Sequence, residues 1–322
     1  MPPKQSSFVM HAAVARHYFS GGSFPIGGSS RIAATVDKVI ENAGGTILIS
    51  AEVDEVIIDK NKATGVKMKD GKIFSAKNII SGAGIMTTYD KLLPKQIVGK
   101  HQLKEQLKKV KRSVSHACLY IELKGSPEEL KLPKTNYWIY PDKIDHDTAV
   151  DNYVKDLKSD FPVVYISFPS AKDPDWSNRY PGKSTIDIIT LLPYEPFDKW
   201  KNSNWMKRDE SYTAMKEKIA QRLLNELYKQ LPHLEGKIEH YELSTPLTTK
   251  HFINYQEGEI YGLDHTPKRF RQRFLKPKTP IKNFYLTGQD IVTAGVAAAL
   301  FSGVITTAAI TRKNIIKKVM QR

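Results

Sequence analysis

The sequence predicts a mixed α/β fold with an antiparallel, α+β segment inserted into it. Three observations carry this prediction. Glycine-rich turns adjoin helical stretches at residues 21–30, 78–87 and 283–295. Apolar residues alternate through the middle of the chain, and a long amphipathic helix follows them. We therefore expect an α/β segment at 1–112, an inserted antiparallel segment at 113–250 and a second α/β segment at 251–322.

Composition and charge limit the function. The 322 residues are 40% hydrophobic and 26% charged, which are globular values. The net charge of +15 favours an anionic partner, or it reflects a lysine-rich surface. One cysteine excludes an internal disulfide framework, and nine histidines without ligand spacing predict no metal site. Because no nucleic-acid-binding motif accompanies the charge, we expect no nucleic-acid partner.

The first segment combines a helix with strands. Ser29 or Ser30 can cap a helix whose apolar stripe should face the core, and Gly44 ends it. Residues 46–60 are rich in β-branched side chains and predict strands, and Asp70-Gly71 predicts a two-residue hairpin turn. The stripe consists of Ile32, Val36, Val39, Ile40 and Ala43.

Residues 78–87 form a degenerate dinucleotide-binding pattern, G-x-G-x-x-T. Thr87 stands where the third glycine is expected, and no strand ending in an acid follows about 20 residues later. This favours a returning strand with a glycine-rich end. A full G-x-G-x-x-G occurs nowhere in the sequence.

The middle segment predicts an antiparallel sheet and a helix. Ala117, Leu119, Ile121 and Leu123 alternate with His116, Cys118 and Tyr120. Further strands are expected in 136–141, 161–170 and 184–194, and a core-facing helix in 207–231.

The stretch "NFYLTGQDIVTAG", at 283–295, predicts a strand, a tight turn and the first turn of a helix. Many α/β proteins hold the phosphate or sugar of a nucleotide cofactor with this arrangement. The following residues, 291–310, carry no charge and precede a basic tail, so they suit either a membrane span or a buried helix. The small residues Gly295, Ala299 and Gly303 share one face of the helix, and a strand leads directly into it. Both observations favour a buried helix.

Two stretches indicate a family. Residues 27–59, "GGSSRIAATVDKVIENAGGTILISAEVDEVIID", resemble the middle of flavoproteins of the amine oxidase and phytoene desaturase superfamily. Residues 244–303, from "STPLTTKHF" to "AALFSG", resemble the carboxy-terminal part of its retinol saturase and carotenoid isomerase branch. The resemblance implies an FAD/NAD(P)-binding, Rossmann-like domain with an inserted substrate domain at 113–250. It also implies that the first βαβ unit, which carries the G-x-G-x-x-G turn, is missing.

The resemblance implies FAD as the cofactor and assigns residues to it. Val53 would meet the adenine, and Asp290 would accept hydrogen bonds from the ribityl chain or act as a helix N-cap. Gly27 and Gly28 either face the flavin or form a simple turn. Without the first βαβ unit we expect the chain alone to bind FAD weakly, so it is a fragment or a second polypeptide supplies that unit. The remaining cofactor candidates are Gly288, Gly295, Val296 and Ala297.

The implied activity is an FAD-dependent oxidoreduction at a carbon–carbon double bond of a retinoid or carotenoid polyene, with NAD(P)H as electron donor. Tyr261 and His251 are proton-donor candidates by neighbourhood, or are structural. Two alternatives stay open: a non-catalytic fragment or subunit, and a membrane-anchored basic binding protein. An apolar substrate and the basic stretches 268–282 and 312–322 predict a cytoplasmic or peripheral-membrane location.

Overall fold

An antiparallel five-stranded sheet forms the centre of one of two units into which contacts divide the chain in the computed structural model, which describes residues 2–321. This sheet unit comprises the residues up to Ile47 together with Val114–Gly258. Its strands follow in the spatial order β6 (Tyr137–Ile139), β7 (Val164–Ser167), β8 (Lys183–Leu191), β5 (His116–Lys124) and β9 (Ile238–Ser244).

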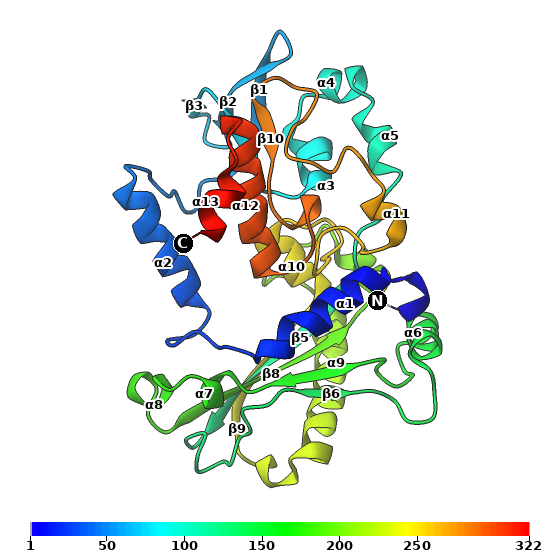
Figure 1. Cartoon of the computed structure of the whole chain (residues 1–322). Coiled ribbons are helices and arrows are strands. Elements are labelled where there is room, and N and C mark those ends of the chain that lie inside the picture. The colour runs from blue at the N-terminus through cyan, green and yellow to red at the C-terminus, as the bar shows by residue number, and fades with distance from the viewer. Residues whose placement is uncertain (1, 322) are drawn as a thin grey trace. The chain divides into compact units, whose positions relative to one another are not determined.

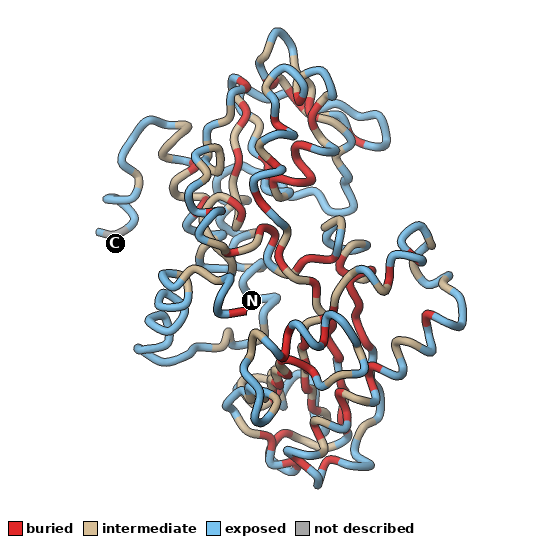
Figure 2. Tube along the Cα trace, turned by 90° about the vertical axis from the view of Figure 1, so that its right-hand side faces the viewer, coloured by how far each residue is buried: buried red, intermediate tan, exposed pale blue. Residues whose placement is uncertain are grey.

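One face of this sheet is the hydrophobic core of the unit. The predicted alternation in β5 is confirmed, because Ala117, Leu119, Ile121 and Leu123 are all at most 2% exposed. The predicted long helix is α9 (Glu210–Gln230), which packs on this face with a stripe that includes Leu223 and Leu227 (Figure 1). Buried stretches follow these strands and this helix in Figure 2.

Shorter elements surround the sheet. Asp209 starts α9 as an N-cap, since its carboxylate accepts a hydrogen bond from the backbone N–H of Tyr212 at 3.0 Å. The other elements of the unit are η1 (Pro3–Gln5), α1 (Phe8–His17), η2 (Tyr18–Ser20), α2 (Ser30–Asn42), α6 (His146–Lys155), α7 (Pro169–Lys172), α8 (Trp176–Arg179), η4 (Glu195–Trp200), η5 (Pro232–Leu234) and α10 (Pro246–Ile253).

The second unit, the turn unit, comprises Leu48–Ser113 and Glu259 onward. It holds an antiparallel sheet of β1 (Val53–Asp59), β2 (Lys62–Met68) and β3 (Ile73–Ser75), and a parallel pair of β4 (Ile79–Ser81) and β10 (Phe284–Leu286). Its helices are α3 (Ile85–Thr87), η3 (Thr88–Leu92), α4 (Lys95–Lys100), α5 (Leu103–Leu107), α11 (Pro267–Phe270), η6 (Gln289–Ile291), α12 (Val296–Thr311) and α13 (Ile315–Met320).

A hairpin forms between β2 and β3 as predicted, but the two-residue Asp70-Gly71 turn is wrong. The backbone N–H of Met68 donates to Lys72 O at 2.8 Å, so the loop has three residues, and only Gly71 among them has positive φ. Gly71 has φ 85°, and the backbone N–H of Lys72 donates to Asp70 Oδ1 at 3.0 Å. The preceding hairpin turns at Lys60 and Asn61, both with positive φ, as a type I′ turn requires. Of the predicted strands in 46–60, only β1 forms.

Two predictions of buried helices are wrong. The stripe of α2 is exposed, with Val39 at 69%, and none of the residues of that helix is buried. In α12 the buried residues are Ser302 and Thr306, whereas Val296 and Leu300 are each 58% exposed. Cβ atoms added at Gly295 or Gly303 would meet nothing within 4 Å, so the small residues of α12 are not used for close packing. Within residues 2–321, no helix is long and apolar enough to cross a membrane.

The predicted division at 112/113 and 250/251 stays a prediction, since it describes which segment binds which ligand. By contacts alone, the chain divides after Ile47, Ser113 and Gly258. The helix α2 therefore groups with the sheet unit. The mixed α/β fold with an antiparallel inserted sheet is confirmed.

Candidate functional site

Two glycine turns meet at one edge of the parallel pair β4 and β10. Because the strands are parallel, their carboxyl ends lie side by side, and this edge is where open α/β sheets bind ligands. Gly84 follows β4 with φ 79°, and Gly288 follows β10 with φ 93°. Both values lie in the left-handed region that glycine adopts without steric cost. Added Cβ atoms at Gly288 would find only Gly82 O, at 3.7 Å.

Asp290 connects the segments around these turns. It is 5% exposed, and each carboxylate oxygen already has a partner. The backbone N–H of Ile85 donates to Oδ2 at 2.7 Å, and that of Leu263 donates to Oδ1 at 3.0 Å. Burial raises the pKa of this carboxyl, and the two N–H donors oppose the rise. The predicted contact of Asp290 with a ribityl chain stays a prediction.

A buried arginine extends this network. Arg269 is 2% exposed, although it belongs to the stretch predicted to dock on lipid, so it cannot contribute to that basic surface. His265 is a further member of the network. Its Nε2 accepts a hydrogen bond from the backbone N–H of Ala294 at 2.9 Å, and burial lowers the pKa of this imidazole to about 4. The guanidinium donates to Leu263 O at 2.9 Å, Gln289 O at 2.8 Å, Asp290 O at 3.2 Å and His265 Nε2 at 3.1 Å.

The amino terminus of α12 lies at the end of the same loop. Gly295 is the N-cap with φ 98°, no side chain caps the helix, and Val296 and Ala297 are exposed. The free N–H groups and the dipole of a 16-residue helix favour an anion here. The loop is held by Ser302, whose Oγ accepts the N–H of Gly288 at 2.7 Å.

The remaining predicted residues are scattered. Val53 begins β1 in the turn unit and is partly buried. Tyr261 is 45% exposed, and its backbone N–H donates to Ser113 Oγ at 2.9 Å. His251 lies on α10 in the sheet unit and stacks on Trp205, with ring centroids 5.1 Å apart. Gly288, Asp290 and Gly295 thus lie between β10 and α12, and Val296 and Ala297 form the first turn of α12, whereas Val53, Tyr261 and His251 lie elsewhere in the chain.

Gly27 and Gly28 lie on the sheet unit. Both have positive φ, and the N–H of Gly27 donates to Asp173 Oδ1 at 3.0 Å, which anchors the glycine-rich loop beside α7.

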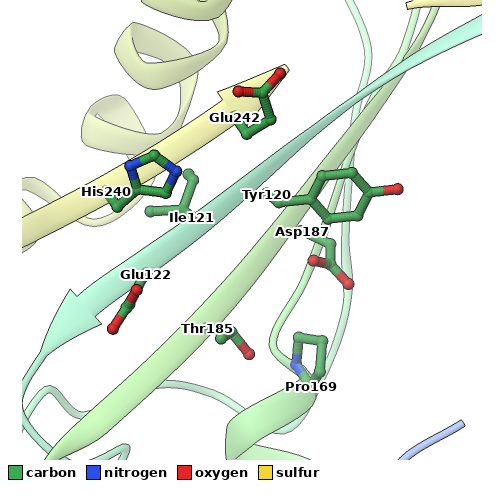
Figure 3. Close-up of a pocket in the computed structure, with 8 residues that line it drawn as sticks. All are labelled: Tyr120, Ile121, Glu122, Pro169, Thr185, Asp187, His240 and Glu242. Carbon is green, nitrogen blue, oxygen red and sulfur yellow. The ribbon is translucent and has the colours of Figure 1, made fainter. Parts of the chain in front are cut away.

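The face of the five-stranded sheet opposite α9, here called the open face, carries an acidic side chain, Asp187, that is not among the predicted site residues. Asp187 on β8 lies opposite Tyr120 on β5. Both line a pocket of about 250 Å³, in which the Asp187 carboxylate lies between the Tyr120 ring and Pro169 (Figure 3). Burial raises the pKa of Asp187 to about 6, and the charge of Lys172 opposes the rise.

A detectable signal for Asp187 exists in the sequence. It is the one charged residue in "STIDIITLLP", and alternation places it opposite to the face formed by Ile186 and Ile188. The sequence carries no such signal for Arg269, because nothing distinguishes a buried arginine from the exposed basic residues on either side of it. Among the described residues, no group of three or more His, Cys, Asp or Glu side chains is placed to hold a metal ion.

The sequence is similar to that of known proteins. The chain is 37% identical to all-trans-retinol 13,14-reductase of Homo sapiens over 325 residues, 97% of this chain and 53% of that protein. The protein of the same name from Danio rerio is 36% identical over 324 residues, with the same coverage. Prolycopene isomerase of Arabidopsis thaliana is 29% identical over 295 residues, 90% of this chain and 45% of that protein. The chain is homologous to these reductases and isomerases. It spans about half the length of each of them.

Solved structures support the same fold. An oxidoreductase from Methanosarcina mazei matches with a TM-score of 0.52 at 16% identity, covering 90% of this chain and 55% of that one. Putrescine oxidase matches with a TM-score of 0.53 at 15% identity, covering 89% and 54%. No family model matches the sequence. The all-trans-retinol 13,14-reductases and the prolycopene isomerase confirm the resemblance to the retinol saturase and carotenoid isomerase branch.

Proposed function

We propose that this chain is the substrate-binding and partial cofactor-binding part of an FAD-dependent oxidoreductase acting on a carbon–carbon double bond of a retinoid or carotenoid polyene. The observation that carries the proposal is the 37% identity to a human all-trans-retinol 13,14-reductase over 97% of this chain. By analogy with these homologues, the proposed reaction is the reduction of one double bond of all-trans-retinol.

The turn unit fits part of an FAD site. Left-handed glycines leave the turns after β4 and β10 without side chains, and the amino terminus of α12 offers N–H groups to an anionic or electron-rich group. Gly288, Gly295, Val296 and Ala297 would hold the cofactor, with Val53 near the adenine. When bound, FAD would supply hydride transfer at its ring. Asp290 and Arg269 would keep the loop in shape through the backbone groups they bind.

Reduction of a double bond consumes two electrons and two protons. We infer NAD(P)H as the source of the electrons. Tyr261 and His251 remain proton-donor candidates; Tyr261 is 45% exposed and His251 is exposed, so a ligand can reach both.

We infer three partners. The first is the apolar polyene. The second is an anionic membrane surface, met peripherally by exposed basic residues such as Lys268, Arg271 and Arg273, which gives a cytoplasmic or membrane-surface location. The third is the G-x-G-x-x-G unit, supplied either by a longer protein of which this chain is a fragment or by a second polypeptide. No nucleic acid is among them.

Flavin binding and product formation test the function. We expect the purified chain to bind FAD weakly in a fluorescence titration, and stoichiometric yellow flavin would contradict that. With FAD, a hydride donor and all-trans-retinol under anaerobic conditions, a product two mass units heavier is expected once a polypeptide carrying the G-x-G-x-x-G unit is added. No such product with any polyene, despite bound flavin, would reject the oxidoreductase.

A second candidate is a non-catalytic subunit that binds the polyene. An inactive all-trans-retinol 13,14-reductase of Danio rerio is 32% identical over 314 residues, so loss of activity occurs among the homologues. Polyene binding without turnover in the reconstituted assay would favour this candidate.

A further inference from the structure

The open face of the five-stranded sheet carries two parallel rows of side chains with opposite polarity. Residues paired across antiparallel strands share a face, so the strand register defines each row. The apolar row consists of Trp138, Tyr165, Ile189 and Cys118. The polar row consists of Ser167, Asp187, Tyr120 and Glu242. The rows are two residues apart along each strand, or about 7 Å.

Asp187 differs from the other carboxylates of its pocket. Glu122 pairs with Lys183 at 2.8 Å, and Glu242 pairs with Lys216. Asp187 is partly buried, yet no described residue donates a hydrogen bond to its carboxylate or forms an ion pair with it within 4.0 Å. A carboxylate partly removed from water without a donor is costly, and such groups cluster at ligand sites.

Lys172 decides the charge of the ligand. Its ammonium donates to Asn136 Oδ1 and to Ser167 Oγ at 2.8 Å, and Ser167 is paired with Asp187 across the sheet. The Phe24 ring lies 5.9 Å from Lys172 Nζ. The positive charge of Lys172 offsets the negative charge of Asp187. The two together therefore favour a neutral group that can both donate and accept a hydrogen bond, rather than a cationic amine.

We propose that the pocket around Asp187 is the subsite for the hydroxyl end of a long apolar alcohol, whose hydrocarbon chain lies along the apolar row. The alcohol O–H donates to the Asp187 carboxylate, and the alcohol oxygen accepts from Lys172. A pocket of about 250 Å³ holds the end of such a molecule and not all of it, because whole-ligand pockets are about 300–1,000 Å³. The inference rests on the proposed function, which supplies the polyene.

Binding measurements on the full chain test this subsite without any cofactor. Three ligands share one polyene: all-trans-retinol, the hydrocarbon with a methyl group in place of the alcohol, and the corresponding primary amine. Titration by ligand fluorescence or absorbance is done with the wild type, Asp187→Ala and Glu122→Gln. Because a hydrogen bond to a charged group is involved, we expect the wild type to bind the alcohol about tenfold more tightly than the hydrocarbon. Asp187→Ala should abolish this preference, and Glu122→Gln, in the same pocket, should keep it.

Other outcomes separate the two proposals. If the wild type binds alcohol and hydrocarbon equally, or the amine most tightly, the subsite is wrong and the polyene substrate stands. Retention of the preference in Asp187→Ala also overturns the subsite. Binding of none of the three ligands rejects the polyene substrate and the subsite with it. Asp187→Asn keeps an oxygen acceptor, so an intermediate preference in this variant, with an unchanged circular dichroism spectrum, separates a lost contact from a lost fold.

Discussion

Each of the two units of this chain has an apolar core, but only in the turn unit does the site add a buried polar network that ties its loops together. In the sheet unit, strands of up to nine residues and the 21-residue α9 bury a large apolar cluster. In the turn unit, β4 and β10 have three residues each, and a buried polar network of Asp290, Arg269 and His265 ties the loops together. Apolar packing tolerates partial loss because neighbours relax, whereas a buried polar network exposes several unmet groups when one member is removed.

The largest expected effect is in the turn unit. Asp290→Ala leaves the buried N–H groups of Ile85 and Leu263 without an acceptor and removes the negative charge near Arg269. We expect the free energy of unfolding to fall by about 4 kcal/mol in a urea titration. Asp290→Asn keeps one acceptor oxygen and should lose about half as much. A loss below about 1 kcal/mol in Asp290→Ala would show that the network does not hold these loops.

Truncation in the sheet unit should cost somewhat less. Leu223 on α9 is fully buried, so Leu223→Ala should lower the free energy of unfolding by about 3 kcal/mol. The matched control is Leu300→Ala on α12, where the side chain is 58% exposed and the change should stay within about 0.5 kcal/mol. Equal losses in the two variants would mean that α12 is covered in solution.

The acid side of the stability curve reports on His265. Its pKa is lowered to about 4 in the folded chain, so protons bind preferentially to the unfolded chain below pH 6.5. Stability is therefore present above pH 6.5 and is lost as the pH falls toward 4, by about 2 kcal/mol. His265→Gln should flatten this region of the curve. The groups facing His265 are Arg269, Asp264 and Tyr261, and an unchanged curve would show that they dominate instead.

The smallest effect has the opposite sign. Asp187 has a folded pKa of about 6, raised from 3.8, so the folded chain binds this proton more tightly. That stability is present below pH 3.8 and is lost as the pH rises through 6. Asp187→Asn should therefore be more stable than the wild type by about 1 kcal/mol at pH 7.5 and equal to it near pH 3.5. The neighbours are Lys172, Tyr120, Cys118 and Tyr165, and destabilisation at pH 7.5 would mean that Asp187 has a structural partner.

Local patterns predicted much of the fold. Alternation predicted which side of β5 faces the core, although Cys118 on the other side is also buried, and helical periodicity predicted α9, because both patterns depend on neighbours in the sequence. Burial was predicted wrongly for α2, from its apolar stripe, and for α12, from its small residues, since neither pattern specifies what covers a helix. For the site, the predicted strand, turn and helix exist as β10, the turn at Gly288 and α12, and they hold five of the candidates. The links of Asp290 to Ile85 and Leu263 span 205 and 27 residues, and no local pattern encodes them.

The exposed side chains of α12 have a practical consequence for anyone who handles this chain. The apolar side chains of Val296, Leu300 and Phe301 are exposed to solvent, at 58%, 58% and 44%. A solvatochromic dye whose fluorescence increases on apolar surfaces would therefore bind the folded chain and fluoresce before any unfolding. Dye fluorescence in a thermal ramp would then start high, so melting should be followed by intrinsic tryptophan emission or calorimetry.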